Sequence, residues 1–417
     1  MENIKTLKCI KCGKEHTVSE GKYTCTACGG NLQVVYDYEK IKTRLTKEAL
    51  KANDDRSIWR YKELLPVSDL KFAPPVQIGW TPLYNAGKMA KQLGIRNVYI
   101  KDDGRNPSAS FKDRAGAVAV AHAREIGETV ITTASTGNAA SSLSCLTASI
   151  GMKTVIFVPK TAPAAKIAQL LVFGAEVIMV NGTYDDAFDL CLKASAEYGW
   201  YNRSTGINPY TREGKKTCAF EICEQLGWNV PDKVFVSVGD GNIISGLWKG
   251  FTDFYKIGLI GRLPKLVAVQ AEHSNAVKLA VDKGTDEIAA VSGETVADSI
   301  SVSIPRDGTA AARAVLESKG FAVSVADSEI LAGIPKVARG AGVFAEPAAA
   351  TAYAGLEKAV KEGKVSPEDS VAVVITGNGL KDVNSAMKAV GKPHLINPNM
   401  EELKKLVDET GMGSSFC

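Results

Sequence analysis

The segment Asn106-Pro-Ser-Ala-Ser-Phe-Lys112-Asp-Arg114 joins two runs of different periodicity. The preceding run, Asn97-Val-Tyr-Ile-Lys101, is typical of a β-strand, and the Ala-rich run from Ala115 to Arg124 is typical of a helix. We therefore expect Lys112 at a strand-to-helix junction, near backbone N–H groups and away from bulk water. Such surroundings lower the pKa of an amine and make it nucleophilic, as imine formation requires. The alternative is a solvated lysine in the first helical turn, and this segment alone does not decide between the two.

The composition indicates a large globular α/β enzyme with more than one folding unit. The chain has 417 residues, of which 45% are hydrophobic and 23% are charged. Its net charge of +4 is spread thinly, so we expect no nucleic-acid partner. There is no apolar run of membrane-spanning length and no signal-peptide core after Met1, so we expect no membrane partner and a cytoplasmic location.

Seven short runs rich in Val and Ile are typical of strands buried on both faces, and helix-like runs lie between them. This alternation predicts βαβ crossovers and parallel sheets covered by helices. Their order suggests a smaller α/β unit at about residues 107–212, inserted into a larger unit formed by residues 37–106 and 213–417. The seven runs are Val98 to Lys101, Thr129 to Thr133, Thr154 to Val158, Glu176 to Val180, Val234 to Val238, Leu266 to Gln270 and Val371 to Ile375. A charged stretch from Tyr38 to Asp55 is also expected to be helical.

Four cysteines near the amino terminus form two Cys-x-x-Cys pairs: Cys9, Cys12, Cys25 and Cys28. Four thiolates at this spacing predict a tetrahedral zinc site, which is structural because the protein supplies every ligand. We therefore expect residues 1–36 to form a zinc ribbon that needs Zn²⁺ to fold. Two redox dithiols are the alternative, but no βαβ pattern surrounds the pairs. A nucleic-acid-binding ribbon is also disfavoured, because interleaved aromatic residues and a basic face are lacking.

Two of the strand-like runs lead into small polar loops that precede helices. The loops are Ser135-Thr136-Gly137-Asn138 and Gly239-Asp240-Gly241-Asn242. Each loop places backbone N–H groups and the positive end of a helix dipole where an anion can bind. Ser135 and Thr136 have an alternative role as N-caps. The second loop lacks the glycine spacing of a dinucleotide-binding motif.

Two further residues at strand ends indicate the ligand. The Asp240 carboxylate would repel a phosphate, so we expect its side chain to turn outward or to bond the amides of its own loop. Thr376 offers a neutral hydroxyl where a strand ends, although a plain turn residue is the alternative. An amine nucleophile, two anion sites and a neutral hydroxyl together fit pyridoxal phosphate. The amine bonds the aldehyde, one loop holds the phosphate, the hydroxyl meets the ring nitrogen, and the other loop is left for a substrate carboxylate.

The chain resembles the threonine synthases, a family of fold-type II pyridoxal-phosphate enzymes with a tryptophan synthase β-like fold. The resemblance covers nearly the whole chain. It rests on the zinc ribbon and on Trp59-Arg-Tyr, Gly79 to Leu83, Asn106 to Arg114, Ser135 to Asn138, Glu213 to Thr217, Phe344 to Pro347 and Thr376 to Asp382. It implies a two-domain α/β fold preceded by the ribbon, and a homodimer.

The resemblance also implies a role for each motif. Lys112 would bond the cofactor and later move protons, Asn138 would hydrogen-bond the cofactor's 3-hydroxyl, and Thr376 would face its ring nitrogen. The loop formed by Gly239, Asp240, Gly241 and Asn242 would surround the cofactor phosphate, and Ser135 and Thr136 would seat the substrate carboxylate. The implied reaction converts O-phospho-L-homoserine and water to L-threonine and phosphate. Zinc removal would loosen the first residues and leave the cofactor attached.

The chain departs from the family pattern where the substrate phosphate is held. The family typically reads Asn-Pro-x-Arg-Leu-Glu-Gly, whereas this chain reads Asn208-Pro-Tyr-Thr211-Arg212-Glu-Gly214. Asn208 and Arg212 are the substrate-binding candidates, but an arginine displaced by one residue points elsewhere unless the loop shifts its register. Arg212, Lys215, Lys216 and Arg306 either rebuild an anion pocket or are solvated charges.

This departure keeps a second function open. The alternative is a related β-replacement enzyme or ammonia-lyase that acts on another small amino acid such as O-phosphoserine, as in cysteate synthesis. A non-catalytic protein that uses a dead enzyme fold as an interaction module is disfavoured by the complete lysine motif.

Overall fold

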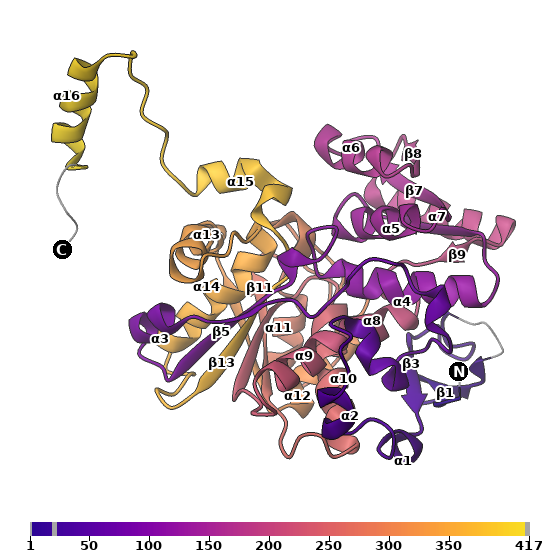
Figure 1. Cartoon of the computed structure of the whole chain (residues 1–417). Coiled ribbons are helices and arrows are strands. Elements are labelled where there is room, and N and C mark those ends of the chain that lie inside the picture. Colours follow the sequence, from indigo (N-terminus) through magenta and orange to yellow (C-terminus); the bar gives the residue numbers. More distant parts are fainter. Residues whose placement is uncertain (1, 19–22, 413–417) are drawn as a thin grey trace.

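Three β-sheets organise the chain in the computed structural model, which describes residues 2–18 and 23–412. The six-stranded and four-stranded sheets form two lobes, and the three-stranded sheet at the amino terminus packs beside them (Figure 1). No helix within the described residues is both long and apolar enough to cross a membrane.

The six-stranded sheet has the order β12-β11-β10-β13-β5-β4. All neighbouring strands are parallel except β4 and β5. Its central strands consist almost entirely of buried residues, as expected of a sheet that helices cover on both faces. The strands are β4 (Leu83–Asn85), β5 (Asn97–Asp102), β10 (Lys233–Ser237), β11 (Lys265–Ala271), β12 (Phe321–Val325) and β13 (Ser370–Ile375). Because β5 pairs with β13, segments far apart in the sequence lie side by side at the sheet centre.

The four-stranded sheet is parallel throughout, with the order β8-β7-β6-β9. Its strands are β6 (Val130–Ala134), β7 (Lys153–Pro159), β8 (Glu176–Val180) and β9 (Tyr201–Asn202), and its covering helices are α5 (Asn138–Ala148), α6 (Ala164–Val172) and α7 (Tyr184–Tyr198). All seven strands expected from the sequence are present. Burial on both faces is wrong for β8, which is an edge strand with no fully buried residue.

The remaining helices surround the larger sheet or extend from it. They are α3 (Gly87–Leu93), α4 (Lys112–Glu125), α8 (Tyr210–Lys215), α9 (Thr217–Gln225), α10 (Asn242–Lys256), α11 (Ala276–Asp282), α12 (Gly308–Glu317), α13 (Asp327–Ala341), α14 (Pro347–Lys361), α15 (Val383–Lys388) and α16 (Met400–Thr410). Short 3₁₀ turns are η2 (Ile58–Leu64), η3 (Leu70–Phe72), η4 (Asp103–Arg105), η5 (Asp298–Ile300) and η6 (Gly379–Asp382). Helix α16 stands apart from the body (Figure 1).

Helix α4 is buried nearly all round because α8 approaches it very closely. A Cβ atom at Gly214 would lie 1.9 Å from the carbonyl oxygen of Arg114, so only glycine fits at this helix crossing. The contact fixes the start of α4, where Lys112 is the first helical residue.

A fully buried ionic cluster joins α4 to β5 and α9. The Arg114 guanidinium bonds Asp103, with Nε 2.6 Å from Oδ2, and Glu221, with Nη2 2.7 Å from Oε2. The Lys101 amine lies 2.7 Å from the same Glu221 oxygen. Two cations therefore depend on one carboxylate in a region without exposed surface.

The amino-terminal sheet has the order β2-β1-β3, from β1 (Ile4–Cys9), β2 (Glu15–His16) and β3 (Leu32–Tyr36). The Tyr36 hydroxyl donates to Glu213 Oε2 in α8 at 2.8 Å, which anchors this sheet to the larger lobe. The expected helix from Tyr38 to Asp55 is wrong in extent. It consists of two short helices, α1 (Tyr38–Ile41) and α2 (Lys47–Lys51), each with its own N-cap, Asp37 and Thr46.

Candidate active site

Lys112 occupies the junction predicted from the sequence, and β13 holds it there. The Phe111 N–H donates to the Thr376 carbonyl at 2.9 Å, and the Asn378 N–H donates to the Ala109 carbonyl at 3.1 Å. Ala109 has φ of +61°, which is uncommon for a residue other than glycine and marks local strain. The start of α4 is therefore clasped to the end of a central strand.

The surroundings of Lys112 favour a neutral amine. Burial lowers the pKa of this amine, and the positive charge of Arg203 lowers it further. The carboxylates of Asp240 and Glu346 oppose both effects. The net shift of the pKa is downward, in agreement with the nucleophile expected from the sequence.

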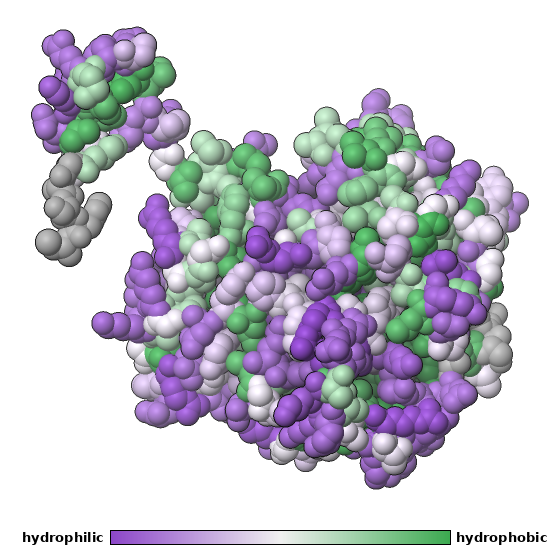
Figure 2. All heavy atoms as spheres, viewed as in Figure 1, coloured by the Kyte–Doolittle hydropathy of each residue, from purple (hydrophilic) through white to green (hydrophobic). Residues whose placement is uncertain are grey.

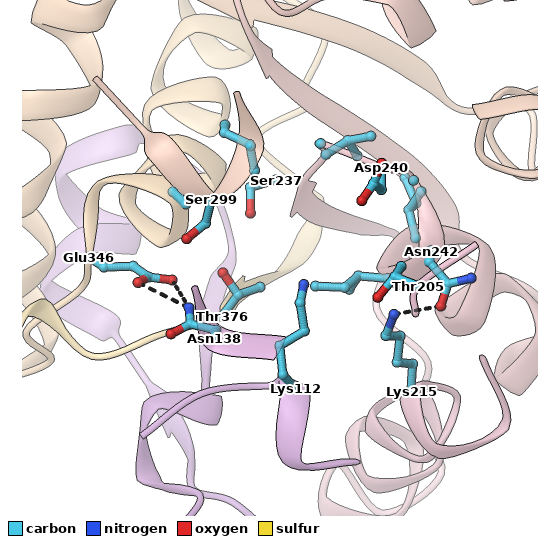
Figure 3. Close-up of a pocket in the computed structure, with 17 residues that line it drawn as sticks. Lys112, Asn138, Thr205, Lys215, Ser237, Asp240, Asn242, Ser299, Glu346 and Thr376 are labelled. Carbon is cyan, nitrogen blue, oxygen red and sulfur yellow. Dashed lines mark hydrogen bonds between the residues drawn. The ribbon is translucent and has the colours of Figure 1, made fainter. Parts of the chain in front are cut away.

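A cavity surrounds the Lys112 amine at the junction of the two lobes. Its polar lining includes Lys112, Asn138, Thr205, Lys215, Ser237, Asp240, Asn242, Ser299, Glu346 and Thr376. Figure 3 shows the amine pointing between the Asn138–Glu346 pair on one side and the Lys215–Asn242 pair on the other. All six residues expected to bind the cofactor besides Lys112 line this cavity with it. They are Asn138, Gly239, Asp240, Gly241, Asn242 and Thr376.

The loop between β10 and α10, residues 239–242, is the glycine cradle. It packs so closely against its neighbours that a side chain larger than glycine does not fit at two of its positions. Gly241 has φ of +89°, and a Cβ atom there would lie 2.7 Å from the Cβ of Ala311. At Gly239 the added Cβ would lie 2.8 Å from the Cα of Ile300. Glycine at both positions therefore lets this loop pack closely against α12 and η5, and the loop leads into the N-terminus of α10 at Asn242, where a phosphate can bind.

Asp240 differs in part from expectation. Its Oδ1 accepts a hydrogen bond from the backbone N–H of Arg306 at 3.2 Å, and not from its own loop. The backbone N–H of Asp307 donates to the Asp240 carbonyl at 2.9 Å. The carboxylate is thus fixed by the segment leading into α12.

Asn138 begins α5 and reaches across to α14. Its Nδ2 donates to Glu346 at 2.9 Å from Oε1 and 3.2 Å from Oε2. Burial raises the pKa of Glu346. Thr376 lies just past the end of β13 and is 7% exposed, so its hydroxyl faces the cavity without being open to solvent.

A second hollow continues from the cavity to the surface between the lobes. It shares Asn138, Ser299, Glu346 and Ala348 with the cavity, and Thr136 lines it. Its far side is formed by α6 and η6, and Figure 2 shows the surface hollowed between the lobe that carries α6 and the lobe that carries α15. Ser135 lies outside this lining, and its Oγ accepts the Gly137 N–H at 3.2 Å.

Asn208 and Arg212 do not reach the cavity. Asn208 donates to the Asn202 carbonyl at 2.9 Å and accepts the Tyr210 N–H at 2.9 Å. Arg212 forms a buried ion pair with Asp307, with Nη2 2.5 Å from Oδ1. Both side chains are engaged in holding local structure, so neither is free to receive a substrate.

Of the four cations considered for a rebuilt anion pocket, only Lys215 lines the cavity. Its amine lies 2.5 Å from Asn242 Oδ1, and burial lowers its pKa well below the ordinary value. Lys216 is paired with Glu213 and Asp253 at 2.6 and 2.7 Å. Arg306 lies at the surface with Asp185, 3.3 Å away.

Two buried residues were not predicted from the sequence: Glu346 as the partner of Asn138, and Arg203. Arg203 follows β9 directly and is fully buried. A signal was present, since an arginine directly after a strand-ending Asn202 lies at the ligand-binding edge of a parallel sheet. The short strand β9 was not recognised, so this signal was not read.

The residues present fit pyridoxal phosphate. A buried amine with a lowered pKa suits the aldehyde, and the bare glycine cradle beside a helix N-terminus suits the phosphate. The Asn138 amide and the Thr376 hydroxyl supply neutral hydrogen-bonding groups for the ring.

The four cysteines converge as their spacing predicts. Their sulfur atoms all lie within 4.8 Å of one another. The Cys9–Cys28 and Cys12–Cys25 sulfur pairs are 3.5 and 3.6 Å apart, close to the edge of about 3.8 Å that a tetrahedral Zn–S₄ site has.

The cysteine cluster is linked to the cradle by a short hydrogen-bond chain. Asn31, three residues after Cys28, donates to Asp307 Oδ1 at 3.0 Å, and Asn242 donates to Asp307 Oδ2 at 2.8 Å. The ribbon is therefore less remote from the site than the sequence suggested.

Zinc removal is expected to weaken cofactor binding modestly. Chelation should loosen residues 2–36 and release the Asn31 bond to Asp307, so the affinity for pyridoxal phosphate should fall about 10-fold or less, as expected for one lost hydrogen bond. Equilibrium titration of the apoenzyme with cofactor, with and without zinc, measures this change. An Asn31→Ala variant that retains zinc should show the same loss of affinity. Equal affinities in all three samples would show that the hydrogen bonds through Asp307 do not couple the ribbon to the cofactor site.

Comparison with known proteins agrees with the site. A family model described as pyridoxal-phosphate dependent enzyme matches residues 75–377. A threonine synthase of Methanocaldococcus jannaschii is 41% identical over 96% of this chain and 99% of that protein, and one of Methanosarcina acetivorans is 38% identical over 96% and 98%. Among solved structures, a threonine deaminase of Solanum lycopersicum has a TM-score of 0.64 at 26% identity, over 75% of this chain and 88% of that one. The chain belongs to the threonine synthase family of pyridoxal-phosphate-dependent enzymes.

Proposed function

We propose that this protein converts O-phospho-L-homoserine and water to L-threonine and inorganic phosphate. The observation that carries the proposal is the placement of Lys112. Its amine, on a half-buried side chain, projects into a cavity that the glycine cradle, Asn138 and Thr376 also line. The choice of substrate is supported by the relatives named threonine synthase. These relatives do not favour the alternative reaction on O-phosphoserine.

The proposed roles of the cavity residues follow from their chemistry. Bound pyridoxal phosphate supplies an electron sink for the carbanion that forms at the substrate Cα. Lys112, with its lowered pKa, takes the Cα proton and returns protons at the substrate carbon chain. Thr376 faces the ring nitrogen with a neutral hydroxyl, and the loop from Gly239 to Asn242 holds the cofactor phosphate.

The substrate side of the site is proposed at the hollow between the lobes. Thr136 and the backbone N–H groups of its loop hold the substrate α-carboxylate at the N-terminus of α5. Ser135 shapes this loop through its bond to the Gly137 N–H. The position of the hollow lets substrate enter between α6 and η6 and reach Asn138 directly.

The proposal also includes a metal ion, a location, an oligomeric state and a division into domains. The cysteine cluster binds a structural Zn²⁺, and the protein acts in the cytoplasm as a homodimer. Its units are the ribbon at residues 1–36, a larger domain at 37–106 and 213–417, and a smaller domain at 107–212. Support comes from the sulfur geometry and from the separate four-stranded sheet.

The test is a product assay on purified holoenzyme. O-phospho-L-homoserine should yield phosphate and threonine in equal amounts, and solvent deuterium should enter the product at Cα and at Cγ, the carbon that becomes the methyl group. O-phosphoserine with sulfite, and serine alone, are the comparison substrates. Turnover of either comparison substrate together with none of O-phosphohomoserine would reject the proposal in favour of β-replacement or ammonia-lyase chemistry.

A further inference from the structure

Arg203 is a fully buried cation with no counter-ion bound to it. Its Nε, Nη1 and Nη2 atoms are all buried, and none has a hydrogen-bond partner within residues 2–18 and 23–412. The other fully buried arginine, Arg114, bonds two carboxylates. Arg203 therefore differs from Arg114 in lacking the partners that such a group normally has.

The carboxylate that attracts the Arg203 charge is that of Asp113, and it already accepts hydrogen bonds from Ser108. Asp113 exerts the main attraction on the Arg203 charge, but its Oδ1 accepts the Ser108 hydroxyl at 2.6 Å and its Oδ2 accepts the Ser108 N–H at 2.7 Å. Burial lowers the pKa of Arg203 to about 10, so the guanidinium remains charged at neutral pH. Leaving such a group unpaired is strongly unfavourable, as when one partner of a buried ion pair is removed. An anion that arrives with the substrate would offset this cost.

The location of Arg203 places it beside the reaction cavity. It follows β9, whose neighbour β6 leads into the loop from Ser135 to Asn138, and Thr205, two residues on, lines the cavity. Its positive charge contributes to lowering the pKa of both Lys112 and Lys215, the two lysines that line the cavity.

The two phosphates of the proposed reaction have separate places in this arrangement. The glycine cradle is at the end of β10 in the larger lobe, and Lys215 bonds Asn242 there, which suits the cofactor phosphate. Arg203 comes from the smaller lobe, on the side of the substrate-carboxylate loop. Because β9 pairs with β6, the strand that leads into this loop, Arg203 belongs to the substrate side of the site and not to the cradle for the cofactor phosphate.

The residue at the usual arginine position does not serve this purpose. Thr211 is fully buried in α8, and its hydroxyl donates to the Asn208 carbonyl at 2.9 Å. The neighbouring Arg212 is committed to Asp307. A cation for the substrate phosphate must therefore come from another segment.

We propose that Arg203 binds the phosphate group of the amino-acid substrate and replaces the arginine that the family carries at the position of Thr211. A planar guanidinium forms two parallel bonds to a phosphate, which gives both affinity and orientation. The inference rests on the proposed function for the identity of the substrate. The anion site itself is tested separately from turnover.

The experiment compares two ligands on the holoenzyme. One is the phosphonate isostere of O-phosphohomoserine, with CH₂ in place of the ester oxygen, and the other is L-norvaline, which lacks the anion. Affinities come from the change in the visible absorption of the bound cofactor. In Arg203→Met, phosphonate affinity should fall at least about 100-fold, as for a truncated buried charge pair, whereas norvaline affinity should change less than threefold. The unliganded spectrum should equal that of the wild type.

A matched control is Arg262→Met, which removes a surface arginine paired with Asp232, at the amino-terminal edge of the larger sheet. Both ligands should bind this variant as they bind the wild type. Equal weakening of both ligands in Arg203→Met, or unchanged phosphonate binding, overturns the inference. If the methionine variant does not accumulate as holoenzyme, Arg203→Lys decides. Selective weakening of the phosphonate supports the site, and wild-type affinity overturns it.

The outcomes separate the two proposals. Arg203-dependent phosphonate binding without threonine formation would reject the proposed function and keep the anion site. Threonine formation together with phosphonate binding that does not depend on Arg203 would keep the proposed function and reject the anion site.

Discussion

Lys112→Ala is expected to lower kcat by at least about 10³-fold, because one amine serves as both nucleophile and proton carrier. Burial and the positive charge of Arg203 both lower the pKa of this amine. The other cavity amine, Lys215, is held by Asn242 at 2.5 Å, so it does not take over (Figure 3).

Borohydride reduction provides a measurement that does not depend on turnover. In the wild-type holoenzyme, reduction should fix the cofactor to the peptide that contains Lys112. The Lys112→Ala variant should lose the visible absorption band and retain no cofactor after reduction and unfolding. Lys215→Ala is the control, in which the label should stay on Lys112. A label found on Lys215 in the wild type would contradict the assignment.

Glu221→Gln is expected to destabilise the fold by about 3–5 kcal/mol, the usual loss when one member of a buried ionic cluster is removed. The reason is that Glu221 is the shared partner of Arg114 and Lys101, all without exposed surface. Chemical denaturation at pH 7 measures the change. The control Glu357→Gln removes a surface partner of Lys336 and should cost no more than about 1 kcal/mol.

The same carboxylate predicts a defined acid sensitivity. Burial raises the pKa of Glu221, but the charges of Arg114 and Lys101 outweigh burial and lower it from 4.5 to about 2. A carboxylate with a depressed pKa in the folded state stabilises fully above its unfolded pKa. This stabilisation, about 3 kcal/mol, should be lost as the pH falls from 4.5 toward 2. In Glu221→Gln this part of the pH dependence should disappear, and an unchanged slope over that range would contradict the role of the cluster.

The parts of the fold that depend on local pattern were predictable. Seven strands of the two lobes have Val/Ile-rich runs and were predicted, whereas β4, β9 and β12 were not. Lys112 follows one of the predicted strands at a strand-to-helix junction. The short strand β9 has only two residues and was missed for that reason. Its absence from the prediction also hid Arg203.

Residues whose roles depend on distant partners were harder to predict. The sequence shows Arg212 one place beyond the usual arginine, but only the fold shows that Asp307 takes it. Likewise, nothing near Asn138 in the sequence indicates Glu346, which comes from the start of another helix. Pairing between segments far apart in the chain decides which charges are free for chemistry.

The cavity is bounded by groups from both lobes, with Lys112 and Asn138 from one set of helices and Thr376 and the glycine cradle from the other sheet. Neither lobe expressed alone would assemble a reactive centre. A movement of one lobe against the other would change the distance between groups that belong to different lobes, such as Asn138 and the glycine cradle. A compound that binds in the hollow between α6 and η6 would then inhibit the enzyme without reacting with Lys112.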